Sequence, residues 1–149
     1  MTKRKEYSSK NLAAIRSCAT KFRAAILRTD GGGLVVLKDF PHGACGDASI
    51  LLGQYLLDQE LGEWTYVSGS RSSDQQTHAW IEKDGLIADI TADQFDDIDE
   101  PVSLTYDPSW HLQFIDRQCH AARIDVYDDQ TQRQLARAYQ DICGRLAGP

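Results

Sequence analysis

The sequence predicts one α+β domain over residues 1–149. Two long segments, 9–28 and 129–146, carry apolar side chains three and four residues apart, as amphipathic helices do. Between them, short segments rich in aromatic and β-branched residues flank the pair Asp84-Gly85, which is a strong signal for a hairpin turn. A chain of 149 residues can bury one sizeable core, and the sequence holds no repeat and no evident linker.

Composition and charge exclude several classes of protein. The hydrophobic fraction of 42% and the charged fraction of 26% are typical of a soluble globular chain. A net charge of -6 argues against nucleic acid as a partner, and we interpret the basic run at residues 3–5 as a solvated end. No apolar run approaches the ~18 residues of a spanning helix, so we expect no membrane partner. Because no secretory signal is evident and the four cysteines lack paired spacing, we expect a cytoplasmic location.

The first predicted helix covers residues 9–28, and Ser8 or Ser9 can cap it. We expect Cys18, which falls beside the apolar stripe, to be a core thiol. The glycines of segment 30–33 end the helix. They do not link a strand to a helix, so we interpret them as a hinge or a substrate-facing loop instead of a phosphate cradle. The apolar positions of this helix are Leu12, Ile15, Ala19, Phe22 and Ile26.

A second helix is predicted over residues 45–61, with Gly62 just beyond its C-terminal end. A loop of small residues brings Cys45 to the first turn of this helix. Unpaired backbone N–H groups and the helix dipole favour a thiolate at such a position. Cys45 is therefore a candidate nucleophile, although a lone cysteine there is more often structural. The predicted buried face of this helix consists of Ala48, Leu51, Leu52, Tyr55 and Leu56.

From Glu63 onward the pattern changes to strands. We predict strands over 64–67, 77–83 and 86–91, with a polar loop over 68–76. We expect Trp64 and Trp80 to lie in the core instead of forming a substrate platform.

The last part of the chain is less regular. Residues 92–111 are predicted to be irregular, and the acidic stretch 93–100 to be a solvated loop. A calcium site there is an alternative, but the regular loop spacing is missing. We predict a further strand over 119–127 and a final helix that begins at Asp129 or Thr131.

The predicted hairpin brings a histidine and a carboxylate together. If Asp84-Gly85 are the two central residues of the turn, Lys83 pairs with Leu86 and Trp80 pairs with Asp89. His78 lies two residues before Trp80, so its side chain projects from the same face. His78 and Asp89 are then diagonal neighbours with backbones about 7–8 Å apart. A different turn length would change this register.

A cysteine nucleophile needs such a pair. The imidazole takes the thiol proton, or forms an ion pair with the thiolate, and later protonates the leaving group. The carboxylate fixes the tautomer and stabilises the imidazolium. The backbone N–H of Cys45 is a natural first donor to the oxyanion of a tetrahedral intermediate, and the sequence identifies no second donor.

These motifs also resemble a known family. Gly-x-Cys at 43–45, His-Ala-Trp-Ile-Glu at 78–82 and Asp-Ile-Thr at 89–91 resemble, in that order, the transglutaminase-like branch of the papain-like cysteine enzymes. The resemblance covers residues 40–95. It implies a helix bearing the cysteine packed against a small antiparallel sheet bearing the histidine and the aspartate.

The resemblance also implies roles. Cys45 would be the nucleophile, His78 the base and Asp89 the residue that orients it. Members of this superfamily hydrolyse peptide or isopeptide bonds, crosslink through acyl transfer or deamidate glutamine. We therefore expect a protein or peptide substrate and no cofactor or metal. Asp39 stands six residues before Cys45, where papain-type enzymes carry a glutamine.

Alternatives to these assignments remain open at this point. His42 is an alternative base or a substrate contact, and the role of Trp110-His111 is undecided. A non-catalytic binding or regulatory module on the same fold is the alternative function. The substrate and the oligomeric state are not predicted. A zinc site would need the poorly spaced set His42, Cys45, Cys119 and His120.

Overall fold

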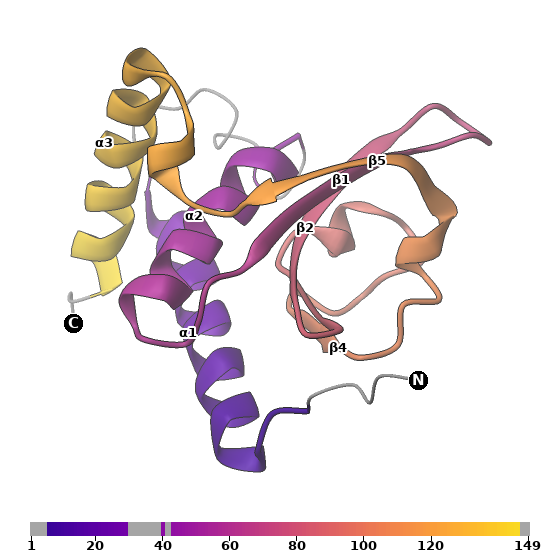
Figure 1. Ribbon diagram of the computed structural model, residues 1–149, viewed down its shortest axis with the longest axis horizontal. Helices are drawn as coiled ribbons and strands as arrows, with labels where there is room; N and C mark the ends of the chain where they lie inside the picture. The colour runs from indigo at the N-terminus through magenta and orange to yellow at the C-terminus, as the bar shows by residue number, and fades with distance from the viewer. Residues whose placement is uncertain (1–5, 30–39, 41–42, 147–149) are drawn as a thin grey trace.

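The computed structural model describes residues 6–29, 40 and 43–146. The expectations for residues 3–5, 30–33, Asp39 and His42 concern positions outside this part of the chain. Within it, three α-helices pack beside a five-stranded antiparallel sheet with strand order β4-β3-β2-β1-β5, so the predicted α+β class is confirmed (Figure 1). None of the described helices is both long and apolar enough to cross a membrane.

The first helix has the predicted bounds, and the last helix has one of its two predicted starts. Helix α1 spans Ser9–Arg28 and begins at the N-cap Ser8, whose hydroxyl accepts a hydrogen bond from the Asn11 N–H at 3.2 Å. Helix α3 spans Asp129–Leu146, so it begins at the first of the two predicted positions.

Helix α2 spans Cys45–Asp58, so its predicted start is confirmed and its predicted end at residue 61 is wrong. The chain leaves the helix earlier because Glu60 adopts the left-handed conformation (φ 61°) expected of Gly62. The Glu60 N–H then bonds to the Leu57 carbonyl, and the Leu61 N–H bonds to the carbonyl of Leu56. This is the Schellman pattern of helix termination.

The strands β1 to β5 are Thr65–Arg71, Thr77–Lys83, Leu86–Asp89, Ser103–Thr105 and Phe114–Ala121. Lys83 pairs with Leu86, which confirms the predicted register of the β2–β3 hairpin.

Three predictions about the sheet are wrong. Residues 68–71 are not loop: they continue β1, because they lie between β2 and β5 and pair with both. The predicted strand over 119–127 in fact begins at Phe114 and ends at Ala121, and Ile124–Val126 form a 3-10 turn instead. The segment 92–111 was predicted to be irregular, but it contains β4, which pairs with β3.

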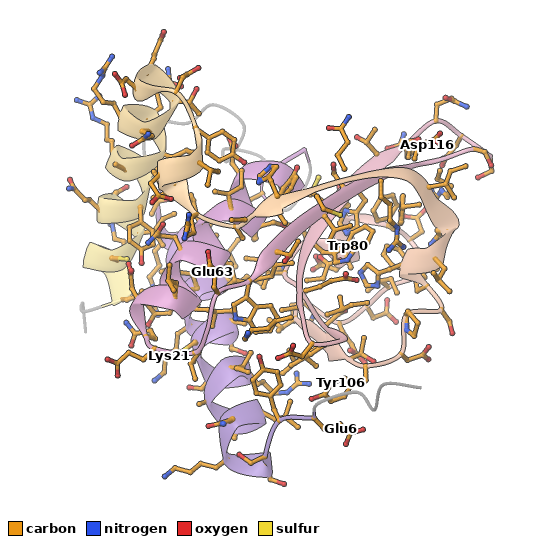
Figure 2. The ribbon with its side chains drawn as sticks, in the orientation of Figure 1. Glu6, Lys21, Glu63, Trp80, Tyr106 and Asp116 are labelled. Carbon is orange, nitrogen blue, oxygen red and sulfur yellow. The ribbon has the colours of Figure 1, made fainter. Side chains whose placement is uncertain are left out.

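The sheet separates two apolar clusters. One contains the buried faces of the three helices together with Trp64 and Ile81, and α2 packs directly on β2 and β1. The other lies on the opposite face and contains Trp80, which Figure 2 labels, together with Phe95 and Phe114. Trp64 and Trp80 are both buried, as predicted.

The acidic stretch is not wholly solvated. Asp93 forms a bidentate ion pair with Arg23 of α1, in which the two nitrogen–oxygen distances are 2.8 and 2.9 Å. The same guanidinium donates to the Ile90 carbonyl at 2.6 Å. The chain that follows β3 is therefore fixed to the first helix.

Two glycines provide a matched test of this packing. A Cβ at Gly53 of α2 would lie 2.6 Å from the Ala122 carbonyl oxygen and overlap the Ala122 side chain. We expect Gly53→Ala to reduce the free energy of unfolding by about 2 kcal/mol. A Cβ at Gly144 of α3 meets nothing within 4 Å, so Gly144→Ala should raise it by about 0.5 kcal/mol. Urea unfolding of both variants measures the difference, and equal effects would contradict the close approach of α2 to Ala122.

Candidate active site

The candidate site is built around the carboxylate of Asp89, which is 1% exposed at the end of β3. Its Oδ2 lies 2.7 Å from Nε2 of His78 and 2.7 Å from Nε2 of His111. Its Oδ1 accepts from the backbone N–H of Thr91 at 3.0 Å and from the Thr91 hydroxyl at 3.4 Å. An ionised carboxylate only accepts hydrogen bonds, so both imidazoles present Nε2–H to it. Burial would raise the pKa of Asp89, but the two histidines outweigh burial and lower it.

His78, on β2, is the histidine that the hairpin register predicts beside Asp89, and the hydrogen bond between them confirms that the two side chains meet. Burial alone would lower the pKa of His78. The charge and hydrogen bond of Asp89, with a smaller contribution from Cys45, instead raise it to about 9. His78 is therefore held largely as an imidazolium at neutral pH.

Aromatic rings enclose this imidazole. Four rings have their centroids 5.1 to 5.7 Å from that of His78, and two of them meet it edge-on. Such an environment excludes water and strengthens the interaction between the charged partners. The four residues are Trp80, Phe95, Trp110 and Phe114.

Cys45 is the first residue of α2, as predicted, and its thiol interacts with the His78 ring closely enough to contribute to the raised pKa of that ring. Because Nε2 of His78 is engaged by Asp89, Nδ1 is the nitrogen that can exchange a proton with the sulfur. Helix α2 has Ala44 as its N-cap, and the first N–H that bonds within the helix is that of Ala48. The N–H of Cys45 thus has no acceptor within α2 and points out of the helix start.

Two residues of the site were not identified from the sequence. His111 begins a 3-10 turn and is 3% exposed, with no hydrogen-bond partner for its Nδ1 among the described residues. The role of Trp110-His111 was undecided from the sequence, and the hydrogen bond to Asp89 now gives the histidine of this pair a defined position in the site. Gln94 lies five residues after Asp89, with its side-chain Nε2 3.2 Å from Nδ1 of His78. The spacing of residues in the sequence could not predict either position, because both residues lie in 3-10 turns between β3 and β5 and not on a strand.

The histidines and Asp89 also form the donor set of many metal centres. They are the one group in the described part of the chain that is close enough to hold an ion. In this geometry, however, each Nε2 carries a proton donated to Asp89, whereas a metal would need both lone pairs. The alternative zinc set is not supported, since the ring of His120 already bonds the Ala121 carbonyl and the Tyr127 hydroxyl.

A groove of about 550 Å³ adjoins the site. Gln94 and Phe95, which both contact His78, line this groove together with Gly43, Arg71 and Gln76. Its lining is mostly polar or charged, which suits a polar substrate better than an apolar ligand.

Comparisons with known proteins add no identification. No family model, curated protein or solved structure matches this chain. The resemblance of its motifs to the transglutaminase-like enzymes therefore stays a prediction, and so do the roles that it implies.

The raised pKa of His78 makes stability depend on pH. In the unfolded chain this group has its ordinary pKa of 6.5, against about 9 when folded. Its contribution is therefore fully present below pH 6.5 and is lost as the pH rises through 9. Relative to His78→Gln, the free energy of unfolding of the wild-type protein should fall by on the order of 1 kcal/mol per pH unit in this range. Urea unfolding at several pH values checks this, and parallel curves for the two proteins would contradict it.

The contribution of His111 to the free energy of unfolding should depend on the presence of Asp89, because the two side chains share a hydrogen bond. Replacing His111 with phenylalanine removes a donor from a buried carboxylate, which should cost about 2 kcal/mol of unfolding free energy. In an Asp89→Ala background the same replacement should cost much less, because the acceptor is already gone. A double-mutant cycle by urea unfolding measures the coupling, and additive effects would contradict it.

Proposed function

We propose that the protein is a thiol-dependent hydrolase or acyl-transfer enzyme that acts on peptide, isopeptide or glutamine amide bonds. The observation that carries the proposal is the hydrogen bond from His78 to Asp89, together with the interaction of the Cys45 thiol with the same imidazole, beside a groove. The order from carboxylate through imidazole to thiol is the one that nucleophilic catalysis by a thiol requires.

The first half-reaction follows from this geometry. The Cys45 sulfur attacks the amide carbonyl carbon, and its proton resides on Nδ1 of His78. The C=O electron pair moves to oxygen, where the N–H of Cys45 stabilises it. When the intermediate collapses, the C–N bond breaks, and Nδ1–H of His78 protonates the departing amine. The acyl group remains on sulfur as a thioester.

The second half-reaction returns the thiol. Water or an amine loses a proton to Nδ1 as it attacks the thioester, and the C–S bond then breaks. Water gives hydrolysis or deamidation, and an amine gives a new amide. Asp89 holds the imidazole ring and stabilises its charged form throughout.

The alternative is a binding module that retains the fold without catalysis. Reactivity of the thiol separates the two, and the chain contains its own reference, since Cys119 is an exposed cysteine on β5. We expect iodoacetamide at pH 6–7 to alkylate Cys45 at least tenfold faster than Cys119, because the imidazole of His78 can take the proton of this thiol and Cys119 has no such partner in the proposal.

Variants of the three residues sharpen this test. His78→Ala should slow alkylation of Cys45 to about the rate of Cys119 and leave Cys119 itself unchanged. Asp89→Ala should slow it less, and Cys45→Ala should abolish any amide-bond activity with little loss of stability. Peptide mapping of the alkylated protein gives the rates. Alkylation of wild-type Cys45 no faster than that of Cys119 would refute the proposal.

A further inference from the structure

Gln94 is held in a defined place. It ends a 3-10 turn, Ala92–Gln94, in which its backbone N–H bonds the Thr91 carbonyl at 3.1 Å. Arg23 binds the Ile90 carbonyl just before this turn and the carboxylate of Asp93 within it. The side chain therefore extends from a backbone fixed to both β3 and α1, and it is half-buried in the wall of the groove.

The amide of Gln94 and the sulfur of Cys45 meet the same imidazole. The amide Nε2 is 3.2 Å from Nδ1 of His78, and the Cys45 thiol interacts with the same ring closely enough to contribute to its raised pKa. A carbonyl carbon bonded to the sulfur thus lies next to the amide. Its oxygen can approach Nε2 to the roughly 2.7–3.1 Å at which an oxyanion donor acts.

The proton on His78 decides what this amide can do. At neutral pH Nδ1 of His78 carries a proton, because Asp89 raises the pKa of the ring to about 9. A protonated Nδ1 cannot accept a hydrogen bond from the Gln94 amide, and no other acceptor for this amide lies among the described residues. The amide N–H is therefore available when negative charge develops on the substrate oxygen.

We propose that the side-chain amide of Gln94 is the second oxyanion donor, acting together with the backbone N–H of Cys45. The inference rests on the proposed function, since it presumes attack by Cys45. It supplies the donor that the sequence does not reveal.

Two reactions of the same sulfur test this role. With 4-nitrophenyl acetate, an S–C bond forms, the carbonyl oxygen becomes an oxyanion, and the C–O bond to 4-nitrophenolate then breaks. With iodoacetamide, sulfur displaces iodide at a saturated carbon and no oxyanion forms. A donor to the oxyanion contributes only to the first reaction, whereas a residue that merely orients His78 contributes to both.

We expect Gln94→Ala to slow acetylation of Cys45 on the order of 100-fold and to change its alkylation less than twofold. Gln94→Met, which keeps about the size of the side chain and removes the donor without adding a charge beside His78, should behave in the same way. Gln130→Ala, which replaces an exposed glutamine on α3 outside the groove, is the matched control and should alter neither rate. Release of 4-nitrophenolate gives the first rate after subtraction of the Cys45→Ala background, and peptide mapping gives the second.

Equal slowing of both reactions in Gln94→Ala, or no change in either, would overturn the assignment of Gln94 and leave the pair of Cys45 and His78 intact. Slow alkylation of Cys45 in the wild-type protein would instead refute the proposed function, and the donor role with it.

Discussion

A buried negative charge organises this molecule. Moving a carboxylate out of water costs several kcal/mol unless it is paired and its oxygens accept hydrogen bonds. Asp89 meets both conditions, with two imidazole N–H groups on one oxygen and the backbone and hydroxyl of Thr91 on the other. These donors come from β2, from the turn that contains His111 and from the chain just after β3. The arrangement therefore fixes three separate segments relative to one another.

The same charge sets the chemistry of the site. Asp89 raises the pKa of His78 to about 9, and aromatic rings around His78 keep water from weakening the interaction. The imidazolium in turn faces the thiol at the start of α2. Because α2 packs on β2, the core that stabilises the fold also fixes the distance between Cys45 and His78. Fold stability and the geometry for proton transfer thus depend on the same contacts.

Local features of the fold could be predicted from the sequence, and distant ones could not. The hairpin register follows from the two-residue turn at Asp84-Gly85, so the meeting of His78 with Asp89 was predictable. The polar end of β1 could not be predicted, because pairing on both sides overrides the weak strand preference of its serines and glycine. The position of His111 depends on a segment of more than twenty residues after Asp89, whose path neither periodicity nor turn rules predict and in which β4 is too short to be recognised from the sequence. Gln94 was missed for the same reason, although it is much closer in sequence.

The central claim is that Asp89 holds Nε2–H of His78 and leaves Nδ1 to exchange a proton with Cys45. Nitrogen-15 NMR of the two His78 ring nitrogens across pH 5–10 tests it most directly. The account predicts that Nε2 stays protonated throughout this range, while Nδ1 loses its proton with a pKa of about 9. Loss of the proton from Nε2, or titration of the ring near its ordinary value of 6.5, would contradict it.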